Sequence, residues 1–203
     1  RAAAALGLAD VEAREALPAL LRAVAAGPPR VVQLSLIALG ELGEADADAL
    51  AAVCSRLGSD APALRFQALV AAGRLMPPGE LRARLVEALA DTESKLRYIA
   101  CRIVEERFFS VAGADDAVLA ELERTLEPLL SDPELDVRVA VAVLLAPRGS
   151  KVARALLVSA LNGRRRFAQR GDEQAAIELC AELGLDAARP GLTSRAFGGG
   201  WFG

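Results

Sequence analysis

The chain contains no histidine, and this absence excludes several kinds of chemistry at once. Serine–histidine and cysteine–histidine nucleophiles, imidazole acid–base catalysis and histidine-ligated metals all depend on that side chain. The three cysteines, Cys54, Cys101 and Cys180, lie far apart in helix-like apolar runs, without the short spacings of metal sites or redox pairs. We therefore expect reduced, buried thiols in a cytoplasmic protein that has no metal site and no cofactor.

Long apolar runs and targeting signals are also missing. Charged residues interrupt every stretch before it reaches the roughly 18 to 20 apolar residues that a membrane span requires. The chain starts at Arg1, without an initiator Met, an apolar signal core or a lipidation motif. We expect no membrane span, and we expect at least one further helix or another domain to precede Arg1.

Aromatic residues make up only 4% of the chain, whereas hydrophobic residues make up 53% and are chiefly Ala, Leu and Val. This apolar content is enough to build a core and excludes a disordered polar chain. Because Ala and Leu occupy helical positions at little entropic cost, the composition favours closely packed helices.

A helix-like segment that ends on a small residue recurs along the chain. The clearest copies are LSLIALGELG at 34–43, ALVAAGRL at 68–75 and AIELCAELG at 176–184. The position near the end of each copy, which we call the closing position, falls at Gly7, Gly40, Gly73, Glu105, Ala146 and Ala181. The resulting intervals of 33, 33, 32, 41 and 35 residues are typical of a two-helix repeat.

Amphipathic segments with helical spacing of apolar residues lie between the closing positions. They cover 14–27, 48–58, 79–91, 117–132 and 150–163. Turns rich in Pro, Gly or Asn separate the segments. VRVAVAVLL at 137–145 alternates like a strand, but its place in the repeat predicts a buried helix. The sequence therefore predicts an all-α fold.

Three helix starts share a common pattern: SDPELDVRVAVAVLLA at 131–146, SDAPALRFQALVAAG at 59–73 and ADTESKLRYIACRIVE at 90–105. They resemble HEAT repeats, in particular the short subtype typified by bilin-lyase HEAT-like repeats, which runs roughly Asp-Pro-x-x-Val-Arg-x-x-Ala to Ala-Leu-Gly. The resemblance covers 1–184 and implies a right-handed α-solenoid of about five stacked antiparallel helix pairs, with the N-terminal pair incomplete.

The Gly- and aromatic-rich tail at 185–203 lies outside this pattern. It contains three consecutive glycines, which do not support a helix, and it concentrates Phe197, Trp201 and Phe202. We expect the tail to cap the last repeat; docking in the groove of the same chain or on a neighbouring molecule are the alternatives.

Arginines stand eight residues before three closing positions, each preceded by an aspartate five or six residues earlier. These ladder residues are Asp60 and Arg65, Asp91 and Arg97, and Asp132 and Arg138. The resemblance implies that such pairs bond to each other and to the next repeat, and we expect this structural role rather than ligand contact. The first full repeat has Gly27 and Val32 at these places, so we expect no such pair there.

Positions seven and three before each closing position are usually charged and face solvent in the resembled repeats. Here the middle repeats are largely apolar at these positions, and we call the set the groove residues: Ile37, Phe66, Val70, Tyr98, Arg102, Val139 and Val143. An exposed apolar stripe is typical of a protein-binding groove, so we expect these residues to receive an amphipathic helix or an extended segment of a partner, with Arg102 at the edge. The alternative is that the register is wrong by one position and that these residues belong to the core.

Charge is unevenly distributed, because 137–171 contains eight basic residues and no acid although the chain carries a net charge of −3. The basic patch comprises Arg148, Lys151, Arg154, Arg164, Arg165, Arg166 and Arg170. Such a patch is suited to nucleic acid, anionic lipid or an acidic protein; a solvated turn or pairing with acids across the fold are the alternatives. The overall acidity and the scarcity of aromatics disfavour nucleic acid as the main ligand.

No catalytic constellation is present, and we expect a non-catalytic protein–protein interaction scaffold or adaptor whose partner is another protein. The resemblance to HEAT-like repeats leaves two alternatives. One is a bilin-lyase-like factor that attaches a chromophore to a partner. The other is a nucleic-acid-binding HEAT-like protein, such as a DNA glycosylase type, that uses the basic region at 138–170.

Overall fold

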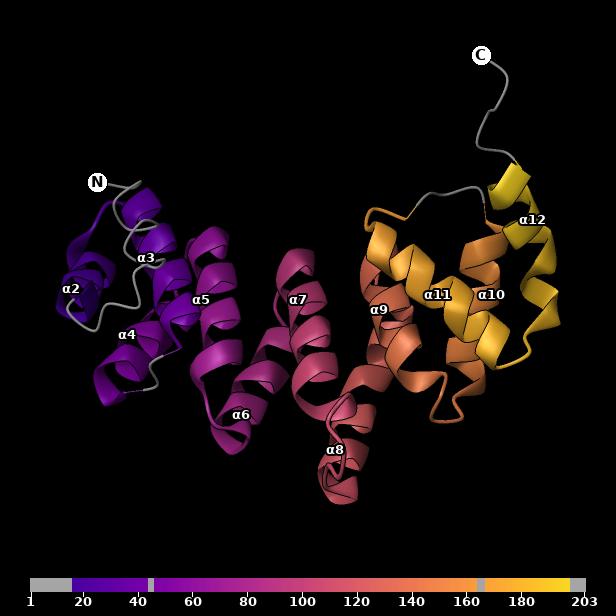
Figure 1. Cartoon of the computed structure of the whole chain (residues 1–203), viewed down its shortest axis with the longest axis horizontal. Helices are drawn as coiled ribbons and strands as arrows, with labels where there is room; N and C mark the ends of the chain where they lie inside the picture. Colours follow the sequence, from indigo (N-terminus) through magenta and orange to yellow (C-terminus); the bar gives the residue numbers. More distant parts are fainter. Residues whose placement is uncertain (1–15, 44–45, 164–166, 198–203) are drawn as a thin grey trace, which may run out of the picture. The chain divides into compact units, whose positions relative to one another are not determined.

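The computed structural model describes residues 16–43, 46–163 and 167–197 (Figure 1). Within these ranges all regular elements are helices and no strand occurs, which confirms the expectation of an all-α fold. The chain divides into two compact units, Arg1–Ser110 and Val111–Gly203. The first closing position, Gly7, lies outside the described residues.

The described part of the first unit contains six α-helices and a short π-helix. They are α2 (Leu17–Ala26), α3 (Pro29–Leu42), α4 (Ala47–Leu57), α5 (Pro62–Leu75), α6 (Pro78–Leu89), α7 (Ser94–Val104) and η2 (Glu105–Phe109). The helices α3, α5 and α7 pack side by side in this order (Figure 1). The intervening helices cover this row, because α2 packs on α3, α4 on α5 and α6 on α7.

Local sequence explains where these helices begin and end. Pro29, Pro62 and Pro78 each occupy the first position of a helix, where the missing N–H costs no intrahelical bond. The N-cap residue of α4 is Asp46, whose carboxylate accepts a hydrogen bond from Ala49 N at 2.6 Å. These helices therefore begin either at a proline, which has no N–H group to satisfy, or at an aspartate that accepts a hydrogen bond from a free N–H group of the first turn.

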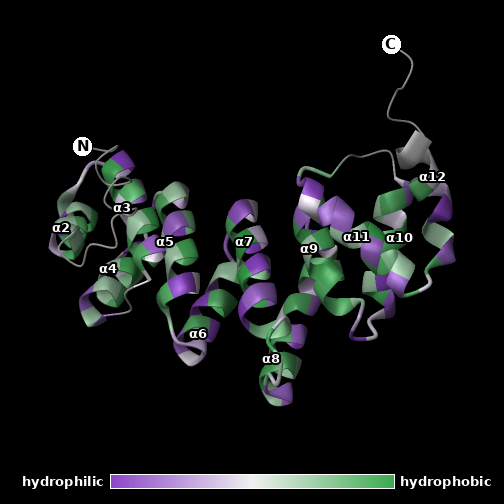
Figure 2. Cartoon of the chain, viewed as in Figure 1, coloured by the Kyte–Doolittle hydropathy of each residue, from purple (hydrophilic) through white to green (hydrophobic). Residues whose placement is uncertain are grey.

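The helices carry both hydrophobic and hydrophilic residues along their length (Figure 2), and the buried residues are almost all apolar. At two closing positions the absence of a side chain allows a close approach. A Cβ atom on Gly40 would lie 3.2 Å from the Cα atom of Ala71, and one on Gly73 would lie 3.1 Å from the side chain of Ile103. Ala71 and Ile103 each stand two residues before the next closing position, so α3 meets α5 and α5 meets α7 in the same register.

The long interval of 41 residues between Glu105 and Ala146 has a structural cause. The chain continues from α7 into η2, where Phe108 is buried, before a loop leads to the next helix. A π-helix accommodates additional residues within a helical segment. Arg107 of η2 donates hydrogen bonds to the carbonyl oxygens of Gly73 and Met76 at the end of α5, the latter at 3.0 Å. The extension thus closes the end of a neighbouring helix.

Among the residues that the structure describes, the second unit contains five α-helices and two short 3₁₀ helices. They are α8 (Asp116–Leu126), η3 (Glu127–Ser131), α9 (Leu135–Leu145), α10 (Lys151–Asn162), α11 (Arg170–Glu182), η4 (Asp186–Ala188) and α12 (Arg189–Phe197). The helix α9 packs against η3, α10 and α11. The prediction of a buried helix at 137–145 is confirmed, because Val137, Val139 and Val141 are all buried within α9.

Part of the Gly- and aromatic-rich tail is helical and packs on α10. Asn162, the last residue of α10, donates from Nδ2 to Ala187 O and accepts from Gly191 N through Oδ1, both at 2.8 Å. A Cβ atom on Gly191 would lie 2.2 Å from Leu161 O, so only glycine permits this approach. The three glycines, Trp201 and Phe202 lie outside the described residues.

Candidate functional site

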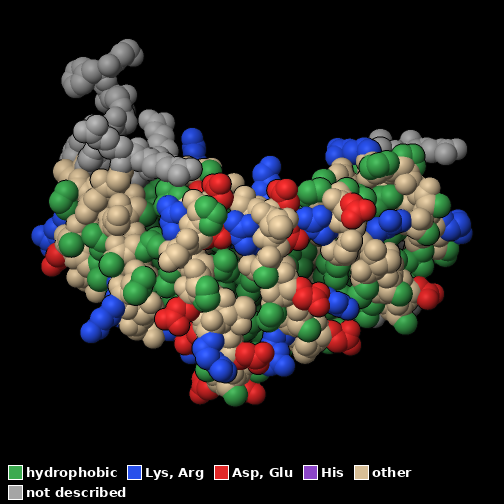
Figure 3. All heavy atoms as spheres, turned by 180° about the vertical axis from the view of Figure 1, so that it is seen from behind, with side chains coloured by type: hydrophobic (Ala, Val, Ile, Leu, Met, Phe, Trp, Pro, Cys, Tyr) green, Lys and Arg blue, Asp and Glu red, His purple; other side chains and the backbone are tan. Residues whose placement is uncertain are grey.

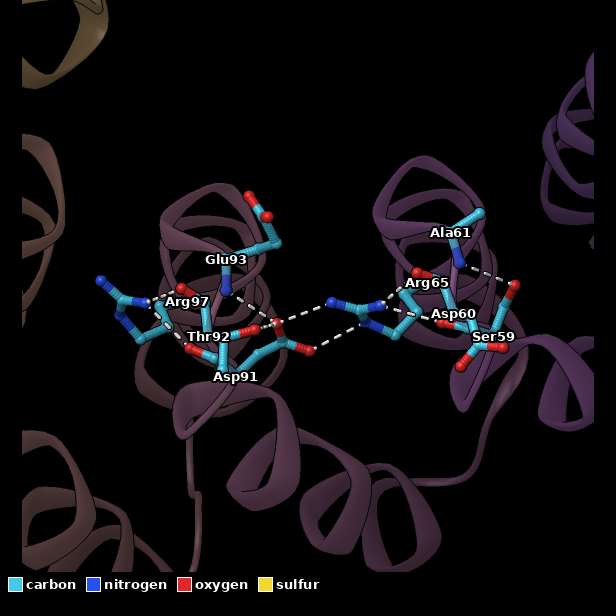
Figure 4. Close-up of polar contacts among 8 residues, drawn as sticks. All are labelled: Ser59, Asp60, Ala61, Arg65, Asp91, Thr92, Glu93 and Arg97. Atoms are coloured by element: carbon cyan, nitrogen blue, oxygen red, sulfur yellow. Dashed lines mark hydrogen bonds and ion pairs between the residues drawn. The ribbon is translucent and has the colours of Figure 1, made fainter.

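Arg65 at the start of α5 forms hydrogen bonds in two directions (Figure 4). Its Nη1 donates to the carbonyl oxygens of Ser59 at 2.8 Å and Asp60 at 3.3 Å, in the turn before α5. Its Nε and Nη2 donate to Oδ2 and Oδ1 of Asp91, each at 3.0 Å, in the turn before α7. The guanidinium therefore joins the beginnings of α5 and α7, and its contact with the Asp91 carboxylate is bidentate.

This ion pair is largely enclosed, with 15% of the Arg65 side chain and 16% of the Asp91 side chain exposed. The hydrogen bond to Asp91 raises the pKa of Arg65. Burial opposes ionisation of Asp91, but the hydrogen bonds from Arg65 and from Glu93 N outweigh burial and hold the pKa of Asp91 below its ordinary value. Both groups are therefore charged throughout the neutral pH range.

Two further ladder arginines repeat the local half of this arrangement. Nη1 of Arg97 donates to Asp91 O at 2.8 Å and to Thr92 O at 3.0 Å, and Nη1 of Arg138 donates to the carbonyls of Asp132 and Pro133. In all three cases the acceptors stand six and five residues before the arginine, which is the fourth residue of its helix. These arginines hold the turns that precede α5, α7 and α9.

The placement of Asp60 among the ladder carboxylates was wrong. Asp91 and Asp132 each accept a hydrogen bond from the amide two residues later, at 2.8 Å. In the turn before α5 the equivalent residue is Ser59, whose Oγ accepts from Ala61 N at 3.3 Å. Asp60 is exposed, and among the described residues its carboxylate acts on Arg65 only through space.

At the first full repeat the position of the arginine is taken by Val32, which is buried and has no side-chain donor. A different arginine serves the neighbouring helix end. Arg56 of α4 donates from Nε and Nη2 to Val24 O at 3.2 and 2.6 Å, and from Nη2 to Ala25 O at 2.9 Å. Sequence reasoning missed Arg56 because its acceptors are backbone carbonyls 31 and 32 residues away.

The groove residues of the first unit lie on the row formed by α3, α5 and α7. Ile37, Phe66, Val70 and Tyr98 are all half-buried. Arg102, one turn after Tyr98, forms an ion pair with Glu105 through Nη1 at 2.6 Å. The first unit thus presents partly exposed apolar side chains on α3, α5 and α7, the three helices of the row.

In the second unit the two groove residues differ. Val143 is half-buried, but the expectation of an exposed position for Val139 was wrong, because Val139 is 0% exposed. The core covers a larger part of α9 than of α5 or α7, because seven of the eleven residues of α9 are buried, against seven of fourteen in α5 and five of eleven in α7. For Val139 the alternative of a core residue is therefore correct.

The described members of the basic patch do not form one array of unoccupied cations. Arg148, Lys151 and Arg170 are exposed, whereas Arg154 is half-buried and donates from Nε to Ala146 O at 3.0 Å. Arg148 forms an ion pair with Glu123. On the face shown in Figure 3, basic and acidic side chains lie next to each other in each unit. The predicted members Arg164, Arg165 and Arg166 lie outside the described residues.

A hollow of about 450 Å³ lies between α8 and the start of α10. Its lining includes Arg124, Arg148, Lys151 and Val152, and 61% of Val152 is exposed. Sequence reasoning missed the hollow because its lining comes from separate segments. An apolar residue such as Val152 on the polar side of its helix is the signal that points to it.

The thiols are free, and Cys101 and Cys180 are buried whereas Cys54 is half-buried. Burial raises the pKa of Cys180. In the described part of the chain no three Cys, Asp or Glu side chains are grouped to hold a metal ion. No helix in the same part is long and apolar enough to cross a membrane.

Comparisons of the chain with protein-family models and with curated proteins find no match.

Proposed function

We propose that the chain is a right-handed α-solenoid of about five HEAT-like helix pairs and acts as a non-catalytic scaffold or adaptor for another protein. Two regularities support the solenoid. Arg65, Arg97 and Arg138 bond the preceding turn in the same way. Gly40 and Gly73 each meet the following helix two residues before its closing position. Equal contacts at equal spacing are what a stack of repeated units requires.

The observation that carries the function is the row of half-buried apolar side chains on α3, α5 and α7. Ile37, Phe66 and Val70 are only partly covered by their own unit, and each comes from a position that is usually charged in the resembled repeats. A partner helix or extended segment with apolar side chains at matching intervals removes this area from water. Each square ångström of apolar surface so buried stabilises the complex by about 25 cal/mol before the costs of association.

Charged groups border the row. The Arg102–Glu105 ion pair lies on the continuation of α7, and the exposed Arg74–Glu41 pair joins the C-terminal ends of α3 and α5. An apolar centre with a polar rim is the usual arrangement of a protein interface. The proposed occupant is therefore an amphipathic segment whose apolar face lies on the row and whose polar residues meet these rims.

The proposal is tested by affinity capture with the wild-type chain and two variants of α5. Phe66→Asp places a charge in the proposed interface, whereas Gln67→Asp places the same charge on the neighbouring half-buried polar residue. We expect a protein that is captured by the wild type and by Gln67→Asp after nuclease treatment, and that is lost with Phe66→Asp.

Thermal unfolding by circular dichroism accompanies the capture experiment. If Phe66→Asp unfolds the chain, as a charge in a core does, the groove assignment is wrong. Equal capture by folded Phe66→Asp and the wild type also rejects it.

The nucleic-acid alternative receives less support, because Arg148 and Arg154 already bond within the chain. The nuclease step of the capture experiment discriminates between the two functions. A captured complex that disappears on nuclease treatment, with an affinity that falls steeply with salt, favours nucleic acid over a protein partner.

A further inference from the structure

Arg138 of α9 uses only half of its guanidinium group. Its Nη1 donates to the carbonyls of Asp132 and Pro133, as Nη1 of Arg65 donates to the turn before α5. In Arg65 the other edge, Nε and Nη2, binds the carboxylate of Asp91. In Arg138 the same edge forms no hydrogen bond or ion pair with any described residue.

The missing acceptor has an origin in the sequence. The helix that follows in the position of α7 is α11, and the residue equivalent to Asp91, six before the fourth residue of that helix, is Phe167. Phe167 is buried, and its side chain has no hydrogen-bond acceptor. Because the whole connection from Gly163 to Gln169 contains neither Asp nor Glu, no carboxylate is available from this turn.

The nearest acid on the same helix is also engaged elsewhere. Asp136, two residues before Arg138, accepts a hydrogen bond from Ala168 N through Oδ1 at 3.3 Å. It therefore ties the turn before α11 to α9 through a backbone amide. In the second unit the bond between Asp136 and Ala168 N thus takes the place of the arginine–aspartate bond of the first unit. The Nε and Nη2 atoms of Arg138 remain available to a further acceptor.

We propose that Arg138 is a preformed site for a carboxylate of an acidic segment in a protein partner. Two carbonyl bonds already fix its guanidinium, so little side-chain freedom is lost on binding, and the Nε and Nη2 edge matches a carboxylate with two parallel hydrogen bonds. From Val137 to Gly171 the chain contains no acid, so the acids nearest to Arg138 in sequence are Glu134 and Asp136, and Asp136 accepts a hydrogen bond from Ala168 N. This inference deepens the proposed scaffold function and rests on it for the kind of partner.

The test uses a fluorescein-labelled peptide of eight glutamates as the probe and a peptide of eight glutamines as the reference, with binding followed by fluorescence anisotropy. Arg138→Lys keeps the charge but removes the two-pronged edge. We expect this variant to bind the glutamate peptide about tenfold more weakly, as for the loss of one charge-assisted bond. Arg65→Lys is the matched control and leaves the affinity unchanged, because Asp91 already occupies the edge of Arg65.

A gain of binding provides the complementary test. Asp91→Ala removes the carboxylate and the acceptor atoms that occupy Nε and Nη2 of Arg65. We expect this variant to bind a second equivalent of the glutamate peptide, which Arg65→Lys in the same background abolishes. A single equivalent in Asp91→Ala, or equal affinity in Arg138→Lys and the wild type, overturns the proposal.

Nuclear magnetic resonance of the wild-type protein keeps the test independent of the stability of the variants. Addition of the glutamate peptide shifts the Nε–Hε signal of Arg138 and leaves that of Arg65 in place. Competition by millimolar inorganic phosphate, together with tighter binding of a twelve-residue oligothymidylate that Arg138→Lys abolishes, assigns the site to phosphate and rejects the acidic segment. The peptide titration does not involve Phe66, so the groove and the Arg138 site fail separately.

Discussion

Arg65 and Asp91 show how one side-chain pair serves two levels of structure. Nη1 of Arg65 bonds to a carbonyl oxygen of the turn before its own helix, and Nε bonds to Asp91 at the start of the next helix of the row. Removing either partner leaves a charge in a largely enclosed place, so the loss exceeds that of an exposed ion pair. The contribution therefore depends on both groups being ionised.

We predict that Asp91→Asn lowers the free energy of unfolding at pH 7 by about 1 to 2 kcal/mol, as for the loss of a charge-assisted hydrogen bond. Because the folded protein holds the pKa of Asp91 below its unfolded value near 4, the contribution is fully present above about pH 5. It is lost as the pH falls through the folded pKa. Urea unfolding at pH 7, 5 and 3 should show the difference between the variant and the wild type shrinking at the lowest pH.

Asp60→Asn is the control for this prediction. The Asp60 carboxylate is exposed and is not hydrogen-bonded to the described residues, so the substitution should change the free energy of unfolding by less than about 0.5 kcal/mol. A pH-independent difference between Asp91→Asn and the wild type would show that the ion pair is not the source of the effect.

The ladder was predictable from the sequence in part. The arginines were identified because each stands eight residues before a closing position, and the structure places each at the fourth position of its helix. Asp60 was misplaced because the prediction accepted an aspartate five or six residues before the arginine, whereas the turn position is six residues before it and is occupied by Ser59. Arg56 bonds only to backbone carbonyls of a distant helix, and such acceptors carry no sequence signal.

At the scale of the helices, the spacing within the row depends on glycine. Gly40 lets α3 approach the backbone of α5, whereas Gly73 faces the side chain of Ile103, which is able to adjust. A backbone atom in the way is harder to accommodate than the end of a side chain. The two closing positions therefore differ in their tolerance, although both carry glycine.

We predict that Gly40→Ala destabilises the protein by about 1 kcal/mol, because the strain of overpacking exceeds the gain of up to about 1 kcal/mol in helix propensity. Gly79→Ala is the control, since a Cβ atom there meets nothing within 4 Å and only the propensity gain remains. Urea unfolding of both variants measures the difference. An equal or larger stability of Gly40→Ala than of Gly79→Ala would contradict the close approach.

The helix α9 shows where the spacing of apolar residues fails to predict secondary structure and burial. Its alternating valines fit a strand, and only the register of the repeat indicated a helix. The same register led to the wrong expectation that Val139 is exposed, because the part of a helix that its neighbours cover is decided by the tertiary structure and not by the segment itself. Sequence predicted the type of this element and failed on which of its faces is covered.

At the scale of the whole chain, the described part of the tail ends the second unit by packing on α10. Asn162 bonds both η4 and α12, and Gly191 lies against the backbone of Leu161. The carbonyls and apolar side chains at the end of α10 would otherwise face water. Terminal elements of repeat proteins commonly supply this cover.

Deletion of residues 189–203 should therefore expose the end of α10 and promote self-association, measured as a concentration-dependent sedimentation coefficient. Gly191→Ala should produce a milder form of the same change, because its Cβ atom collides with Leu161 O. Gly171→Ala, where a Cβ atom meets nothing within 4 Å, serves as the control. An unchanged sedimentation coefficient in the deletion variant would exclude a capping role.

The buried thiols give each unit a chemical reporter of its own opening. Cys101 lies in the interior of the first unit and Cys180 in that of the second. Because only the thiolate reacts, and burial raises the pKa of Cys180, an alkylating reagent modifies this residue only after α11 has moved away from its neighbours. The rate of labelling at each thiol thus measures how often the unit that contains it opens locally.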